Sequence, residues 1–105
     1  MALTQLPDGL LEAIRNYLDI TWDDPDTDKK LTGIALRGMR YLDAVAGESL
    51  DYTAQDKPLE LLLDYVRYVR SGAMDEFQGN YLHELLALQI QREVARHDLT
   101  ETADV

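Results

Sequence analysis

Cysteine is absent from the 105 residues of this chain. Its absence excludes disulfides, zinc fingers, iron-sulfur clusters and thiol catalysis. Long apolar runs are lacking too: the densest, residues 59–69, contains Glu60, Asp64 and Arg67, whereas a membrane span needs about 20 predominantly apolar residues. Residues 1–7 show no basic region and no apolar export segment. We therefore expect a soluble protein made in a cytoplasm, with no membrane partner.

Positive charge is scarce. Ten Lys and Arg residues stand against twenty Asp and Glu, giving a net charge of −10, and five of the ten basic residues lie on each side of Gln55. Affinity for nucleic acid comes largely from basic side chains that neutralise phosphates, so we expect no tight DNA binding. A channel through which DNA passes without specific binding remains compatible with this charge.

Strand-like alternation of β-branched residues is nearly absent, and apolar residues recur at helical spacing. The pattern predicts an all-α fold, a compact bundle of about four helices over residues 8–19, 25–46, 58–77 and 81–96. The length predicts one helical domain over residues 1–97, followed by a polar and flexible C-terminal tail over 98–105. The residues expected in the core are Ile14, Leu18, Leu31, Ile34, Leu42, Leu62, Val66, Val69, Leu86 and Ile90.

The second helix has the clearest boundary signals. Asp24 followed by Pro25 is typical of a capping residue and a first helical position, and Gly47 suits a left-handed C-terminal cap. Inside this helix, Gly33 and Gly38 each cost about 1 kcal/mol relative to alanine. We interpret both glycines as places of close helix approach or of a local bend.

Two segments resemble metal sites in part. Asp24, Asp26 and Asp28 have the spacing that opens a calcium loop, but Lys29 replaces the required glycine and Ala35 replaces the required glutamate. Helix capping is therefore the favoured interpretation of these aspartates.

The second segment is His83-Glu84, which begins like a zinc protease helix. Position 87 is alanine instead of the second histidine, and His97 is fourteen residues away. No nucleophile and base stand at a recognisable spacing, and no glycine-rich phosphate loop follows a strand. We expect no enzymatic activity, no metal and no cofactor.

The helix expected over 58–77 carries apolar residues on more faces than its own bundle needs to cover. Either it is the central helix of the bundle, covered from several sides, or its surplus apolar surface also supplies a subunit interface. Two arginines on the same helix are natural partners for acidic faces of neighbouring copies. Trp22, in the turn between the first two helices, is either a lid over the helix ends, which is the favoured interpretation, or an interface anchor. The candidate interface residues are Leu61, Tyr65, Tyr68, Arg67, Arg70 and Trp22.

Four groups of residues together resemble the phage head-tail connector family, the small helical proteins that complete the head of long-tailed phages. They are Tyr17-Leu18-x-Ile20-Thr21-Trp22-Asp23-Asp24-x-Asp26-x-Asp28-x-x-Leu31-x-x-Ile34, Tyr41-Leu42 with Ala46-Gly47, Pro58-x-x-Leu61-Leu62-Leu63-x-x-Val66-Arg67-Tyr68, and Glu76-Phe77-x-x-Asn80. The resemblance lies in their order and separations, which span most of the chain.

The resemblance implies a virion structural protein, of a phage or prophage, without catalysis or cofactor. It implies that about a dozen copies assemble as a homo-oligomeric ring on the portal protein after DNA packaging. Such a portal adaptor extends the DNA channel and joins the head to the next head-completion, stopper or tail protein. Its location would be the host cytoplasm during assembly and then the head-tail junction of the virion.

A second function class remains open, a small acidic helical regulator or inhibitor that binds a basic cytoplasmic partner. Stoichiometry distinguishes the two classes. A connector forms a ring of many copies on a portal, whereas an inhibitor binds one partner at a low ratio.

Overall fold

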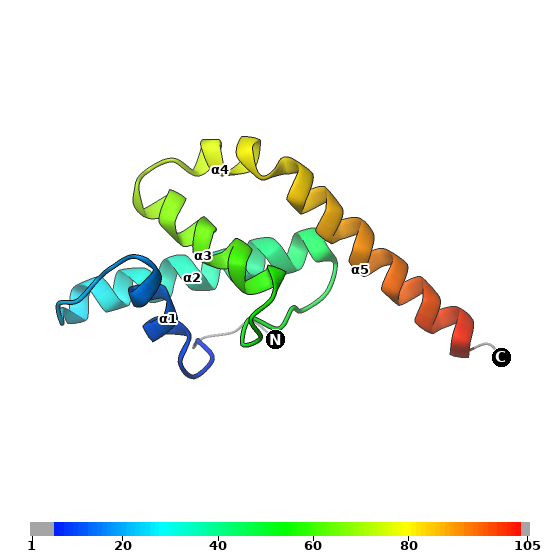
Figure 1. Ribbon diagram of the computed structural model, residues 1–105, viewed down its shortest axis with the longest axis horizontal. Helices are drawn as coiled ribbons and strands as arrows, with labels where there is room; N and C mark the ends of the chain where they lie inside the picture. Colours follow the sequence, from blue (N-terminus) through cyan, green and yellow to red (C-terminus); the bar gives the residue numbers. More distant parts are fainter. Residues whose placement is uncertain (1–5, 104–105) are drawn as a thin grey trace.

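The computed structural model describes residues 6–103, with the side chains of residues 6–97. This part of the chain forms five helices and contains no strand, which confirms the all-α prediction (Figure 1). Their bounds are α1 Leu10–Tyr17, α2 Pro25–Ala46, α3 Lys57–Arg70, α4 Met74–Asn80 and α5 Leu82–Ala103.

Helix α2 is the longest element of the globular body and begins and ends where the sequence predicts. Asp24 is the N-cap residue, and its carboxylate accepts hydrogen bonds from the Asp26 N–H (3.1 Å) and the Thr27 hydroxyl (2.8 Å). Gly47 closes the helix with a φ of 76°. The capping interpretation of Asp24 is confirmed, and the 22 residues of α2 form a rod of about 33 Å.

The prediction of a single helix over 58–77 is wrong, because the helix ends at Arg70. The Ser71 hydroxyl donates to the carbonyls of Arg67 (3.1 Å) and Tyr68 (3.0 Å) at the end of α3. Gly72 then adopts a φ of 76°, a left-handed conformation that glycine takes without a steric penalty. The chain reverses there, and α4 packs back against α3 (Figure 1).

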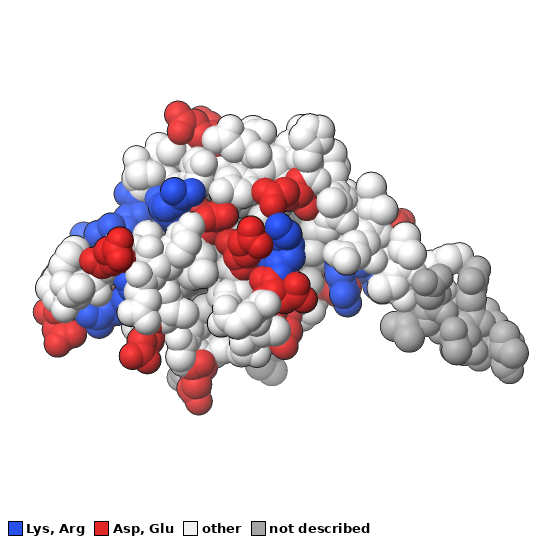
Figure 2. All heavy atoms as spheres, in the orientation of Figure 1, with Lys and Arg blue, Asp and Glu red and all other residues white. Residues whose placement is uncertain are grey.

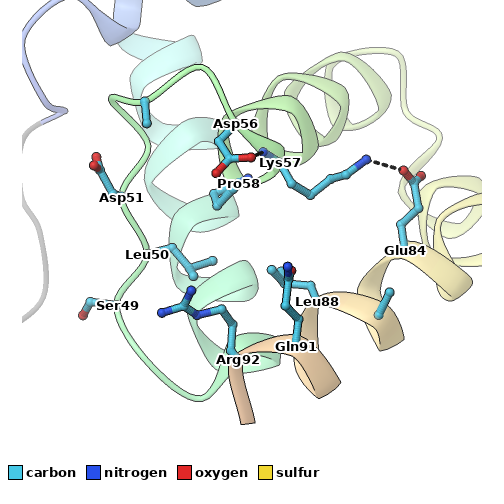
Figure 3. A pocket seen from close by; sticks show the side chains of 12 residues that line it. Ser49, Leu50, Asp51, Asp56, Lys57, Pro58, Glu84, Leu88, Gln91 and Arg92 are labelled. Carbon is cyan, nitrogen blue, oxygen red and sulfur yellow. Dashed lines mark hydrogen bonds and ion pairs between the residues drawn. The ribbon is translucent and has the colours of Figure 1, made fainter. Parts of the chain in front are cut away.

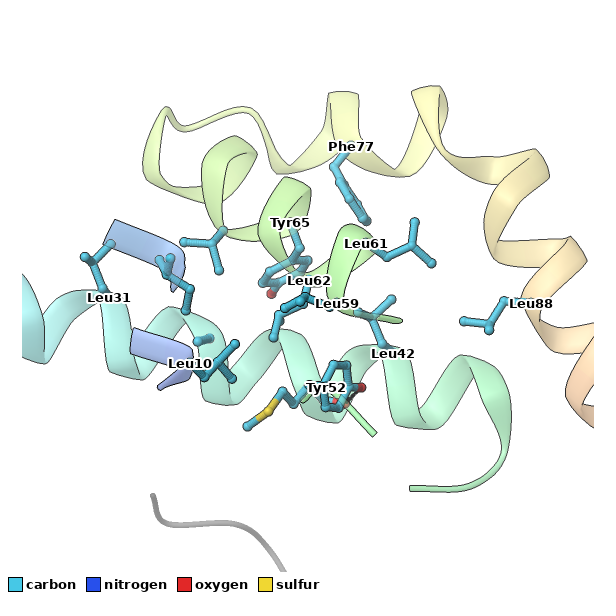
Figure 4. Packing of buried hydrophobic residues seen from close by; sticks show 14 of the residues in the cluster. Leu10, Leu31, Leu42, Tyr52, Leu59, Leu61, Leu62, Tyr65, Phe77 and Leu88 are labelled. Carbon is cyan, nitrogen blue, oxygen red and sulfur yellow. Dashed lines mark hydrogen bonds between the residues drawn. The ribbon is translucent and has the colours of Figure 1, made fainter. Parts of the chain in front are cut away.

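The core lies between α1, α2 and α3, with α4 and one side of α5 closing it (Figure 4). Five of the residues expected there are fully buried: Ile14, Leu31, Leu42, Leu62 and Val66. Leu18, Ile34 and Val69 are half-buried at its edge.

At Gly38, α2 and α3 are in close contact, which agrees with the interpretation of this glycine as a place of close helix approach. A Cβ atom at this position would lie 2.6 Å from Cδ1 of Tyr65 and 2.8 Å from Cδ1 of Leu62. Gly33 differs, because a Cβ atom there would meet only a guanidinium nitrogen of Arg37, at an ordinary 3.5 Å.

Helix α5 departs most from expectation. Leu86 and Ile90, predicted to be buried, are 45% and 59% exposed, whereas Leu85 and Leu88 face the core. The helix also continues to Ala103, so the predicted end at residue 96 is wrong; residues 104–105 of the expected tail lie outside the described residues.

The last turns of α5 extend past the end of α2 (Figure 1). They give the molecule extents of 55 × 29 × 22 Å and a radius of gyration of 15.2 Å, against about 13 Å for a compact chain of this length. In the part of the chain that the structure describes, no helix has both the length and the apolar character needed to cross a bilayer.

Candidate interaction surface

One face of α5 exposes a row of aliphatic side chains. They recur every four residues, which places them on one side of a helix. Their exposed fractions run from 45% to 59%. The row, here called the α5 apolar row, consists of Leu82, Leu86, Ile90 and Val94. Because α5 buries other leucines against its own core, this row is available to a partner.

Ion pairs hold α5 in place against the rest of the chain. Nε of Arg92 lies 2.6 Å from Glu48, and Nη1 of Arg96 donates to the carbonyl of Ala46 at 2.8 Å, at the end of α2. The hydrogen bond from Arg92 lowers the pKa of the Glu48 carboxyl. These contacts fix the direction in which α5 leaves the body, and with it the direction in which the row faces.

A third ion pair ties the beginning of α5 to the beginning of α3. Lys57 lies 2.9 Å from Glu84 and 3.3 Å from Glu60. Lys57 lies at the edge of a hollow of about 750 Å³ between α5 and the connection that precedes α3 (Figure 3). Arg92 lines the same hollow. Both cations are already paired with carboxylates, so neither is available to bind a ligand in the hollow.

Two predicted interface residues are buried inside the chain. Leu61 is fully buried and Tyr65 is 7% exposed, so the expected outward stripe on α3 is wrong. The break at residues 71–72 is the reason, since it folds Phe77 of α4 back over this stripe. The rings of Tyr65 and Tyr68 each contact Phe77 edge-on, with centroids 5.5 and 5.8 Å away.

The other candidate interface residues lie at or near the surface. Arg67 is exposed over the half-buried ring of Tyr68, with 5.1 Å between its guanidinium carbon and the ring centroid, and Arg70 is exposed in the last turn of α3. Trp22 is 51% exposed, so the lid interpretation is wrong. None of these residues belongs to α5, so the structure does not join them to the apolar row.

Asp64 is the only charged residue in the buried class among those described. Its carboxylate accepts hydrogen bonds from the hydroxyls of Tyr17 and Tyr81, the second at 2.9 Å, and lies 3.7 Å from Arg67. Burial, together with the bond to Asp64, raises the pKa of Tyr81 to about 12. Burial and the same acceptor also raise the pKa of Tyr17. The two hydroxyls act as donors that join helices, which is a structural role.

No family model, curated protein or solved structure matches this chain. The four-residue spacing of the α5 apolar row is visible in the sequence, but spacing alone does not tell which of two apolar rows on a helix faces the core. Among the described residues, no group of three acidic, histidine or cysteine side chains is placed to hold a metal ion.

Proposed function

We propose that this protein is a structural adaptor that assembles as a ring on a phage portal, extends the DNA channel and joins the head to the next head-completion or tail protein. The observation that carries the proposal is the α5 apolar row, presented on a helix that extends beyond the body. An exposed apolar helix face is typical of a protein interaction site. The sequence resemblance supplies the class of partner.

The charge of the molecule supports this role. Figure 2 shows that most basic side chains of one face gather near its left end, and that acidic side chains lie beside them and across the rest of the face. With a net charge of −10 per copy, a ring would repel the DNA backbone rather than bind it. Such a wall suits a channel through which DNA passes.

The same charge governs assembly. About a dozen copies at −10 each repel one another, so we expect monomers in dilute solution and a ring once the portal acts as a template. Salt screens this repulsion over roughly 8–10 Å at physiological strength. Raising the salt concentration therefore promotes assembly where repulsion dominates.

The test is electron microscopy of the chain mixed with the portal protein encoded near it. We expect a ring of about a dozen copies on the portal. Ile90→Glu should prevent it, whereas Gln89→Glu, which adds the same charge at an exposed position beside the row, should not. A chain that stays monomeric beside its portal refutes the proposal. Binding of one basic cytoplasmic partner at a low ratio would favour the regulator instead.

A further inference from the structure

A second apolar surface lies on the outer side of α2. It is a hollow of about 540 Å³ whose floor contains Gly33 and Ile34. We call it the α2 groove; its lining residues are Asp26, Lys29, Lys30, Gly33, Ile34 and Arg37. Three of these six are cations, in a chain where acidic residues outnumber basic ones two to one.

Gly33 is not explained by packing inside the chain. The space beside it would accept a Cβ atom without a clash, in contrast to Gly38 against α3. Glycine nevertheless costs a helix interior about 1 kcal/mol relative to alanine. The absence of a side chain at Gly33 instead leaves room on the floor of the groove for a group from another molecule.

The three cations of the groove form no close ion pair with a described carboxylate, although Lys30 interacts electrostatically with Asp24. Lys29, Lys30 and Arg37 are exposed, and none of them lies within ion-pairing distance of a carboxylate in the described part of the chain. Arg15, Lys57 and Arg92, by contrast, each have one. The groove has an apolar floor, and its edge carries three cations against the single carboxylate of Asp26. Such a surface fits an apolar helix that carries acidic residues.

Residues 90–94, in the middle of α5, have that character. Ile90 and Val94 are 59% and 53% exposed, and Glu93 is exposed between them without an ion pair to a described residue. The exposed apolar and acidic side chains of residues 90–94 are complementary to the apolar floor and the cations of the α2 groove.

The two surfaces cannot meet within one copy. The groove lies in the first half of α2, whereas α5 is anchored at the opposite end of α2 and points away from it (Figure 1). A contact between two different surfaces of identical chains is head-to-tail, and repeated head-to-tail contacts close into rings when the rotation allows.

We propose that the α2 groove receives residues 90–94 of α5 from a neighbouring copy of this chain. Ile90 and Val94 then pack over Gly33 and Ile34, and Glu93 faces the cations at the edge. This contact rests on the ring proposed above and names the surfaces that form it.

The first test fills the groove. Gly33→Leu should keep the melting temperature at or above that of the wild type, because leucine is the better helix former, and should abolish rings on the portal. Gly79→Leu is the matched control, since Gly79 also lies in a helix with open space around it. If the wild type and Gly33→Leu form rings equally well, the groove contact is refuted while the adaptor function stands.

The second test needs no portal. The chain has no cysteine, so Lys30→Cys and Val94→Cys can be mixed in concentrated solution and oxidised. We expect mixed disulfide dimers to form at least tenfold faster than from Lys30→Cys mixed with Asp75→Cys, an exposed position on α4. Equal rates refute the contact. Fast cross-linking of this cysteine pair, together with a wild-type chain that never binds a portal, would support the contact and refute the adaptor function.

Discussion

The hydroxyl of Tyr81 donates a hydrogen bond of 2.9 Å to Oδ2 of Asp64, which joins the turn before α5 to the middle of α3. Tyr17 donates to the other carboxylate oxygen from the end of α1. One buried carboxylate therefore orients three segments that are distant in the sequence. Together with the ion pairs of α5, this bond orients the start of α5.

Asp64→Ala should lower the free energy of unfolding by about 2–4 kcal/mol, because two tyrosine hydroxyls lose a charged acceptor in a buried setting. Urea unfolding followed by circular dichroism measures the change. Glu93→Ala, at an exposed position of α5, should change stability by less than about 0.5 kcal/mol. Equal effects of the two substitutions would show that Asp64 has no special role.

Gly38→Ala should destabilise the protein by about 1–3 kcal/mol despite the better helix propensity of alanine. The reason is the clash of the new methyl group with Tyr65 and Leu62, at 2.6 and 2.8 Å. Thermal unfolding of the variant measures it. A rise in melting temperature would mean that α2 and α3 are not in close contact at this position.

Leu62→Ala should cost about 2–5 kcal/mol, because it leaves a cavity in the core. Ile90→Ala should cost less than about 1 kcal/mol, since this side chain is 59% exposed. Chemical denaturation of both variants compares them directly. A large loss for Ile90→Ala in the monomer would place the α5 apolar row in the core after all.

Stability should fall as the pH rises above 10. Burial and a 2.7 Å hydrogen bond to Asp43 raise the pKa of Tyr52 above the unfolded value of 10.0. A raised pKa means that the stabilisation is complete below pH 10 and is lost as the hydroxyl ionises above it, by at most about 1.4 kcal/mol per pH unit. Tyr52→Phe should be less stable at pH 8, with a shallower decline between pH 10 and 12; an unchanged slope would contradict this assignment.

The sequence predicts α2 well because its boundaries are set by local chemistry. The carboxylate of Asp24 and the left-handed conformation of Gly47 act on adjacent backbone groups, so they are visible without tertiary structure. The break after Arg70 is harder to predict. Apolar spacing continues through Val69, Ala73 and Phe77, and only the short Ser71-Gly72 pair opposes it.

The interaction surface is the least predictable part for a related reason. Leu85 and Leu88 form one apolar row of α5, and the more regular row beginning at Leu82 forms another. The regular spacing of the second row favours it as the buried row. Which row is buried is decided, however, by the face of α5 that packs against α2. That depends in part on the ion pairs of Arg92 and Arg96 with Glu48, which lies in the connection after α2, more than forty residues earlier in the sequence.

Because α2 is one uninterrupted helix, it fixes the distance and the rotation between Gly33 on its outer surface and Gly47 at its end. Fourteen residues separate these two positions, a distance of about 21 Å along the axis. A single inserted residue would lengthen that spacing by about 1.5 Å and turn one end against the other by about 100°. Deletions and insertions between residues 38 and 45 would therefore alter the angle between successive copies in an assembly, even where every contact residue is retained.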